Sequence, residues 1–192
     1  MIAIESVQRV LAKDEVRSLA RRYFIANGFD GTLTTIGVVI GAVMSGITDG
    51  RAVIAIGLGA AVGLGTSGIW SIWEIERAEI SRQREALEQD MLVDLEDTRI
   101  ARDLRLGQVM LAFAAAAGPV IAVVLMLVPF LFVDLAYDVL VGAMISIGLG
   151  VLLLGAVGAY MGLISKQRWY VAAIRMGLAG LVVAAISLVL PG

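Results

Sequence analysis

Residues 52–73 read AVIAIGLGAAVGLGTSGIWSIW and carry no charged side chain. A helix that crosses the hydrocarbon core of a bilayer needs about 20 predominantly apolar residues. This stretch reaches that length without interruption, which the core of a soluble protein does not require. It therefore predicts a transmembrane helix.

Four other stretches have the same apolar character and a comparable length. Two of them contain an ionisable residue, with Asp30 near the start of the first and Arg175 inside the last. Pro119 and Pro129 lie in another, and we expect them to kink or end it. The four stretches are residues 29–47, 107–133, 139–164 and 169–190. The sequence thus predicts an all-α integral membrane protein with five transmembrane helices.

The composition limits the chemistry that the chain can perform. Hydrophobic residues make up 59% of the sequence, against roughly 45–50% in soluble globular proteins. Cysteine and histidine are both absent, which excludes disulfides, Cys/His zinc sites and thiol nucleophiles. Metal ligands must then be oxygen atoms or a methionine thioether, a set that suits Mn²⁺ or Fe²⁺ better than Zn²⁺ or Cu²⁺. With no catalytic motif present, we expect no enzyme activity, no cofactor and no nucleic-acid partner.

The basic residues are distributed unevenly between the ends of the predicted spans. With five spans, all of the 15 Lys and Arg residues except Arg51 fall on one side of the membrane. Cytoplasmic loops of membrane proteins carry the excess of Lys and Arg. The distribution therefore predicts an N-in, C-out topology, and an even number of spans would remove the separation.

The predicted spans divide the chain into four segments. In the first, Ile4, Val7 and Leu11 recur at helical spacing, as in an amphipathic helix. No cleavable apolar run opens the chain, which favours a prokaryotic plasma membrane. The segments are an N-terminal cytosolic or interfacial helix (1–28), the first two spans (29–73), a short acidic cytosolic helical hairpin (74–106) and the last three spans (107–192).

Small residues are concentrated in the second and fourth predicted spans. Glycine lets helix backbones approach closely where no hydrophobic force drives them together. We read the pattern as a packing signature rather than a site, and it favours a tight bundle and a homodimer. The glycines are Gly57, Gly59, Gly63, Gly65, Gly68, Gly142, Gly148, Gly150, Gly155, Gly158 and Gly162.

Residues 27–32 read NGFDGT and place a carboxylate inside the first span. Asp30 lies about 12 Å beyond Arg22 along a helix. Ionisable groups at such depth are costly and mark functional sites. We expect Gly28 and Gly31 to open the backbone so that carbonyl groups reach a cation. Burial favours the protonated carboxyl and an approaching cation favours the carboxylate, which is the coupling that a metal/proton exchanger needs.

A structural role for Asp30 is the alternative. Arg175 lies about a turn and a half into the last span and begins from the same side of the membrane, so the two residues have a similar depth. A buried ion pair between them would need no transport function. The two roles are compatible if a metal ion or a proton displaces the arginine.

Carboxylates are dense in the predicted hairpin. Glu76 and Glu79, and then Glu85 and Glu88, are spaced three residues apart, which places each pair on one helical face. Like charges at this spacing repel, so they are tolerated when they are solvated or when a cation bridges them. A metal site and a solvated face interleaved with arginines are both consistent with this pattern.

Three stretches of the chain share the pattern of a known family. Residues 22–31, RYFIANGFDG, contain an Asp-Gly pair after a small or polar residue. Gly63-Leu64-Gly65 leads into a Glu-rich continuation of the second span, and residues 155–180 contain GAVG followed by Trp169, Arg175 and Gly180. In this order they resemble the vacuolar iron transporter family of divalent-metal/proton exchangers.

The resemblance implies a dimeric exchanger that moves Fe²⁺ or Mn²⁺ out of the cytosol in return for protons. It implies that Asp30 is the carboxylate of the first helix and that Glu85 and Glu88 belong to acidic helices that gather metal near the pore. The chain departs from the family at Val62, where a methionine is frequent. Met44, about 20 Å from Asp30 along the helix, is another thioether on roughly the same face. The acidic segment is also shorter than in the plant members.

Two functions from different classes are therefore expected. The first is a metal/proton exchanger, and the second is a non-transporting membrane protein whose residues 74–106 dock a partner. The apolar stripe on that segment is thin, which favours the exchanger. The predicted transport-pathway residues are Asn27, Asp30, Thr34, Met44 and Arg175, and the predicted metal ligands are Asp30, Glu76, Glu79, Glu85 and Glu88.

Overall fold

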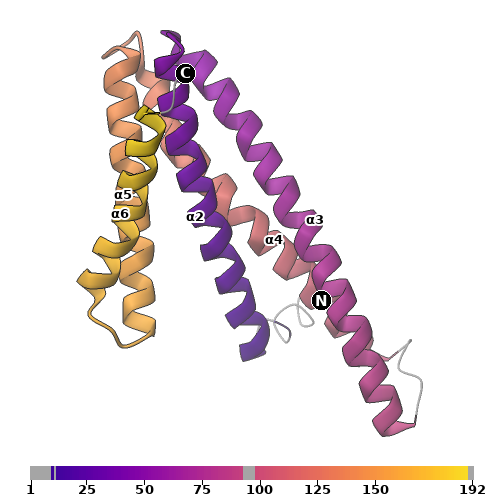
Figure 1. The fold of residues 1–192 in the computed structure, drawn as a ribbon. Helices are drawn as coiled ribbons and strands as arrows, with labels where there is room; N and C mark the ends of the chain where they lie inside the picture. The colour runs from indigo at the N-terminus through magenta and orange to yellow at the C-terminus, as the bar shows by residue number, and fades with distance from the viewer. Residues whose placement is uncertain (1–9, 11, 93–97, 190–192) are drawn as a thin grey trace.

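The computed structural model describes residues 10, 12–92 and 98–189, which form five long helices (Figure 1). A short 3-10 helix, η1 (Val128–Phe132), extends the third of them. The long helices are α2 (Asp14–Met44), α3 (Gly50–Met91), α4 (Arg99–Leu127), α5 (Val139–Ile164) and α6 (Trp169–Val189).

All five helices are long and apolar enough to cross a membrane. This confirms the prediction of an all-α chain with five candidate spans. The predicted bounds of the fourth span coincide with α5, and α6 begins at the predicted Trp169. The predicted amphipathic positions Ile4, Val7 and Leu11, and the last predicted span residue, Leu190, lie outside the described residues.

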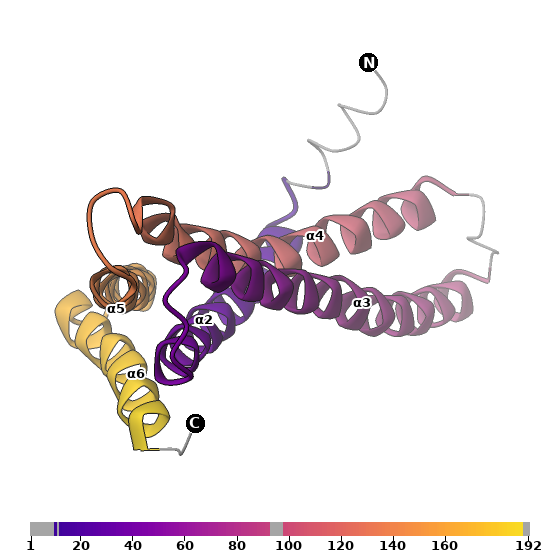
Figure 2. The ribbon, with the colours of Figure 1, turned by 90° about the horizontal axis from the view of Figure 1, so that it is seen from above.

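The helices are arranged as two antiparallel pairs joined by α2. One pair is α3 with α4 and the other is α5 with α6, while α2 contacts all four (Figures 1 and 2). The α3–α4 pair extends beyond α2 at the end of the molecule where α2 begins (Figure 1). We call this the charged end, because it also holds the dense carboxylates and arginines of the sequence.

The first helix is continuous through the position where we expected its backbone to open. Residues 14–44 are helical throughout, so the boundary expected between residues 28 and 29 falls inside α2. The carbonyl oxygens of Gly28 and Gly31 accept hydrogen bonds from the hydroxyl groups of Thr32 and Thr35, at 2.8 Å and 2.7 Å. The prediction that the two glycines open the helix is therefore wrong.

The two glycines instead allow α2 and α4 to cross closely. A Cβ atom added at Gly28 would lie 3.4 Å from the backbone of Gly118, and one at Gly31 would lie 2.6 Å from the Cα atom of Pro119. A Cβ atom added at Gly118 would collide with the carbonyl oxygen of Phe24. The spacing of the glycines therefore serves helix packing, as small residues do in membrane helices.

Proline affects α4 less than the sequence suggested. The helix continues through Pro119 and ends only where Pro129 stands in η1. Proline lacks the N–H that would bond to the carbonyl group four residues earlier, which here is that of Ala115. The side-chain amide of Asn27 donates to this carbonyl oxygen at 3.0 Å. A residue of α2 thus replaces the hydrogen bond that Pro119 cannot make.

The apolar core lies between the helix pairs. Its largest buried cluster joins α2, α3, α4, η1 and α5 through residues such as Val39, Val53, Val123, Phe130 and Ala143. Where α4 passes into η1, the hydroxyl group of buried Ser146 donates to the carbonyl oxygen of Met126 at 2.7 Å. The core therefore holds α5 against α4 at the end opposite the charged end.

Candidate functional site

Asp30 lies on α2 beside α6. Together with Arg175 it lines an open groove of about 340 Å³, whose other walls include Phe29 and Met176. No ion pair within 4.0 Å joins Asp30 to Arg175, although both are described by the structure. The structure thus brings the two predicted residues to one groove without pairing their charges.

Three of the predicted pathway residues share one exposed strip of α2, which we call the α2 strip. Asp30, Thr34 and Met44 are all exposed in a single copy of the chain. On an ideal helix their side chains fall within about 80° of one another. The opposite side of α2 carries buried residues such as Thr35 and Val39, which pack toward α4 and the core. The strip is therefore the side of α2 that the bundle leaves uncovered.

The fourth residue that we predicted on α2 has a different position. Asn27 is partly buried and its amide is engaged by the Ala115 carbonyl group. Val62, which stands where the resembled family often has methionine, is 69% exposed on α3. Neither side chain lines the groove that holds Asp30 and Arg175.

A second cavity, at the charged end, collects carboxylates from three helices. It measures about 730 Å³ and lies among the start of α2, residues 75–83 of α3 and the start of α4. Glu76 is the most buried of its acidic side chains, at 9% exposure, and accepts a hydrogen bond of 2.8 Å from the hydroxyl group of Tyr23. Glu79 also lines the cavity, and the amide of Gln83 donates to it at 3.5 Å.

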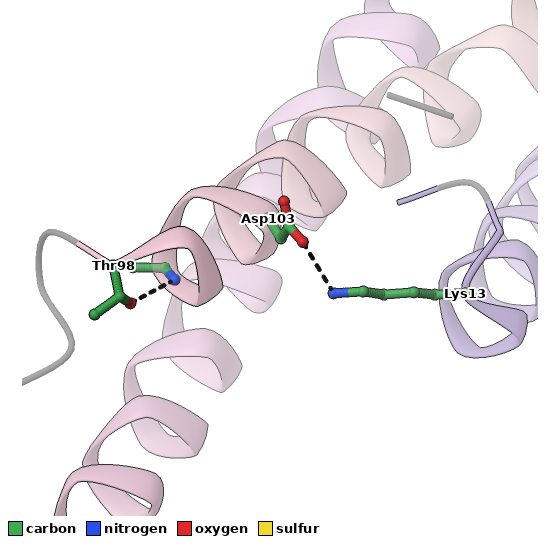
Figure 3. Close-up of polar contacts among 4 residues, drawn as sticks. Lys13, Thr98 and Asp103 are labelled. Atoms are coloured by element: carbon green, nitrogen blue, oxygen red, sulfur yellow. Dashed lines mark hydrogen bonds and ion pairs between the residues drawn. The ribbon is translucent and has the colours of Figure 1, made fainter. Parts of the chain in front are cut away.

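An ion pair closes another side of this cavity. The ammonium group of Lys13 lies 3.6 Å from a carboxylate oxygen of Asp103, whose side chain is 12% exposed (Figure 3). Thr98 caps the start of α4 by accepting a hydrogen bond from the backbone nitrogen of Ala101 (Figure 3). The cavity therefore contains both a paired carboxylate and hydrogen-bonded ones.

The other two predicted metal ligands lie farther along α3. Glu85 is exposed, and Glu88 is half-buried with its carboxylate 3.4 Å from Nε of Arg84. Within the part of the chain that the structure describes, no three or more Asp or Glu side chains form a group that could hold a metal ion. Asp94 and Asp97, which extend the acidic pattern in the sequence, lie outside the described residues.

Sequence reasoning missed Tyr23, Lys13 and Asp103 as parts of this cavity. The Tyr23–Glu76 hydrogen bond joins residues 53 positions apart. The sequence contained only an indirect signal for them. Tyr23 and Lys13 lie where the first helix changes from charged to apolar, and this boundary is at the same end as the acidic residues. Their convergence depends on how α2 packs against α3 and α4.

Fold and site together define a class: an all-helical, membrane-compatible protein with one carboxylate in the apolar part of its helices and an acidic cavity at one end. No protein-family model matches the chain. The uncharacterized protein MJ0645 of Methanocaldococcus jannaschii is 30% identical to the chain over 166 residues, which cover 85% of this chain and 84% of that protein. The chain belongs to the same family as MJ0645.

Proposed function

We propose that the chain is a multi-pass transporter of the prokaryotic plasma membrane that exports Fe²⁺ or Mn²⁺ from the cytosol in exchange for protons. The observation that carries this proposal is the position of Asp30. It is the one carboxylate in the apolar part of the five helices, and it stands in an open groove beside Arg175. A carboxylate at membrane depth is costly, and in transporters such groups mark ion pathways and proton relays.

The proposed orientation places the charged end in the cytosol. Among the residues that the structure describes, every Lys and Arg except Arg51 lies at or near this end of the five helices. The positive-inside rule then assigns the start of α2 and the end of α3 to the cytoplasmic side. Trp73 ends the uncharged stretch of α3 and Trp169 begins α6, and they are 40% and 56% exposed on the same side, as interface anchors are.

Exchange follows from competition at Asp30. A divalent cation and a proton compete for the same carboxylate oxygens, so binding of one releases the other. Arg175 shares the groove without an ion pair to Asp30, which leaves the carboxylate oxygen atoms of Asp30 accessible to a cation. Oxygen ligands of this type suit Mn²⁺ or Fe²⁺.

The acidic cavity at the charged end is the proposed route by which metal reaches Asp30. Glu76 and Glu79 line it, and Glu85 and Glu88 follow about two to three turns beyond Glu79 along α3. Such a series attracts cations from the cytosol and raises their local concentration. Of these four residues, Glu76 lies nearest the apolar part of α3 and is the one that we expect to pass metal onward.

We further propose that the working unit is a homodimer formed through the α2 strip. A single copy exposes Asp30 and Thr34 on the side that would face lipid, which is costly for a charged group. One carboxylate is also too few ligands for a divalent cation. A second copy related by two-fold symmetry would cover the strip and bring a second Asp30 to the same place.

The second candidate function is partner docking by the end of α3. Leu87, Met91 and Leu92 are 38%, 53% and 89% exposed there. Exposed apolar residues in a charged segment favour a protein contact. This function needs no ion movement, so a transport assay separates it from the first.

The test is transport by purified protein in sealed proteoliposomes with an imposed pH gradient. Fe²⁺, Mn²⁺, Co²⁺ and Zn²⁺ are compared, with metal and proton fluxes recorded by dyes inside the vesicles. We expect Fe²⁺ or Mn²⁺ movement coupled to opposite proton movement, and none in protein-free vesicles. If folded and inserted protein moves none of these ions, the exchanger is excluded and docking is favoured.

A further inference from the structure

A third groove lies between α3 and α4, and its charge differs from that of the acidic cavity. It measures about 500 Å³, and no residue of α2 lines it. Its charged lining residues are Arg77, Arg84 and Arg105, with no Asp or Glu among them. We infer that this arginine groove binds the phosphate of an anionic lipid headgroup.

A buried polar contact links the two helices that form the groove. The amide of Gln108, which is 6% exposed, donates to the carbonyl oxygen of Trp73 at 2.7 Å and so fixes α4 against α3 at this level. Gln108 and Ile80 line both the arginine groove and the acidic cavity. The α3–α4 pair therefore presents a basic side here and an acidic side toward α2.

The arginines retain donors for an anion. Arg105 is exposed, and no ion pair within 4.0 Å joins it to a described carboxylate. Arg77 forms an ion pair with Glu74 at 3.8 Å, and Arg84 forms one with Glu88 at 3.4 Å. A guanidinium group has five N–H donors, so one such contact leaves others for phosphate oxygens.

The position of the groove selects a lipid over a soluble phosphate. Trp73 ends the uncharged stretch of α3, and Arg77 follows it by four residues, about 6 Å along the helix. On α4, Arg105 precedes Gln108 by three residues, about 4.5 Å. Both arginines thus stand where the apolar part of the helices ends, at the height of lipid headgroups. Basic pockets between helices at this level bind anionic headgroups.

The apolar lining is consistent with the rest of a lipid. Trp73, Ile80 and Val109 contribute apolar walls to the groove. Trp70, one turn nearer the middle of α3, is 71% exposed. Aromatic side chains of this kind lie at membrane–water interfaces. An acyl chain could therefore follow the surface of α3 and α4 while its phosphate contacts the arginines.

The experiment titrates purified full-length protein in detergent with phosphatidylglycerol and with phosphatidylcholine. Bound lipid is counted by native mass spectrometry, and stability is followed by thermal unfolding. We expect saturable binding and stabilisation by phosphatidylglycerol only. At about 1 kcal/mol per basic residue near a membrane surface, Arg105→Gln should raise the apparent Kd about fivefold and Arg77→Gln/Arg105→Gln about 25-fold.

The control variant is Arg102→Gln, which removes an exposed arginine of α4 that does not line the groove. It should bind as the unmodified protein does. Arg77→Lys/Arg105→Lys keeps the two positive charges and should retain most of the binding. A loss of binding in the glutamine variants alone is then due to the removed charge and not to misfolding. Soluble glycerol phosphate should neither bind nor stabilise.

Three results would overturn the inference. Equal binding by the unmodified protein and Arg105→Gln would remove the arginines from the site. An equal loss in Arg102→Gln would show attraction by overall charge instead. Binding of glycerol phosphate with the same dependence on Arg105 would assign the groove to a soluble phosphate compound. The inference does not depend on which ion the protein moves, so failure of the transport assay leaves it standing.

Discussion

At the scale of single residues, the polar side chains of α2 divide into two groups. The first group donates side-chain hydrogen bonds to backbone carbonyl groups inside the bundle and consists of Asn27, Thr32 and Thr35. Asp30 and Thr34 lie on the uncovered α2 strip. The first group is explained by packing, because a buried polar atom without a partner is costly. The second group has no such explanation within one copy of the chain.

We predict that Asp30→Asn abolishes metal-coupled proton flux. The substitution keeps the size and hydrogen-bonding capacity of the side chain. It removes the negative charge of the carboxylate, for which a cation and a proton compete. The measurement is the proteoliposome assay, with size-exclusion elution to show an intact fold. Asp134→Asn is the matched control, since Asp134 is exposed near the opposite end and asparagine tolerates its positive φ of 70°. Undiminished flux in Asp30→Asn would remove Asp30 from the pathway.

We predict that Asn27 and Pro119 are energetically coupled. Asn27→Leu leaves the Ala115 carbonyl group without its 3.0 Å hydrogen bond and should destabilise the protein by about 1–3 kcal/mol. In a Pro119→Ala background the same change should cost much less, because the new alanine supplies its own N–H to that carbonyl group. A double-mutant cycle from unfolding in detergent measures the coupling. Equal costs in the two backgrounds would contradict this account of α4.

At the scale of elements, α2 and α4 cross with their backbones close together. Gly28 and Gly31 on one helix meet Gly118 and Pro119 on the other. Backbones that approach this closely gain dispersion contacts that larger side chains would prevent. The crossing positions Asp30, because it sets which side of α2 faces away from α4.

We predict that Gly118→Ala destabilises the bundle. The added methyl group would meet the Phe24 carbonyl oxygen and lie 2.9 Å from the backbone nitrogen of Gly28, and backbone atoms cannot move aside as a side chain can. Such overpacking costs about 1–3 kcal/mol. Gly148→Ala makes the same change on α5 with nothing within 4 Å of the new atom. It should be neutral, or stabilising by up to about 1 kcal/mol through helix propensity.

Thermal unfolding of the two alanine variants in the same detergent gives the comparison. The expected result is opposite signs, or a loss only in Gly118→Ala. An unchanged melting temperature in Gly118→Ala would show that α2 and α4 do not cross as closely as the structure has them.

At the scale of the whole molecule, the arrangement leaves α2 central and yet uncovered on one side. The helix contacts α3, α4, α5 and α6, but the α2 strip remains exposed between the two helix pairs. A homodimer through this strip would convert an exposed carboxylate into a shared, enclosed site. It would also place two acidic cavities at the same end of the assembly.

We predict that a single cysteine at residue 34 links two copies of the chain. The natural sequence has no cysteine, so Thr34→Cys offers one thiol per copy. A short bis-maleimide added to membranes should give a covalent dimer on a denaturing gel. Leu152→Cys, on α5 and 69% exposed, is the control and should not be linked. Linkage in the control but not in Thr34→Cys would place the interface elsewhere.

Much of the helical architecture could be predicted because it depends on local properties. Apolar length alone identifies a membrane-compatible helix, so α5 begins and ends where the sequence indicated and α6 begins there too. Glu74 is the first charged residue after the apolar part of α3, and Arg105 is the last charged residue before the apolar part of α4. The side on which Asp30 lies could not be predicted, since it depends on the rotation of α2 about its axis.

The sequence by itself determined the number and apolar character of the candidate membrane-spanning helices, and the presence of one carboxylate within them. Only the tertiary structure decided that Gly28 and Gly31 allow α2 to pack closely against α4 and do not interrupt the helix. It also decided that the Asn27 amide donates a hydrogen bond to the Ala115 carbonyl group. It also brought Tyr23 to Glu76 and three arginines to one groove. Hydropathy and spacing are properties of one helix, whereas these contacts depend on the depth and rotation of each helix relative to its neighbours.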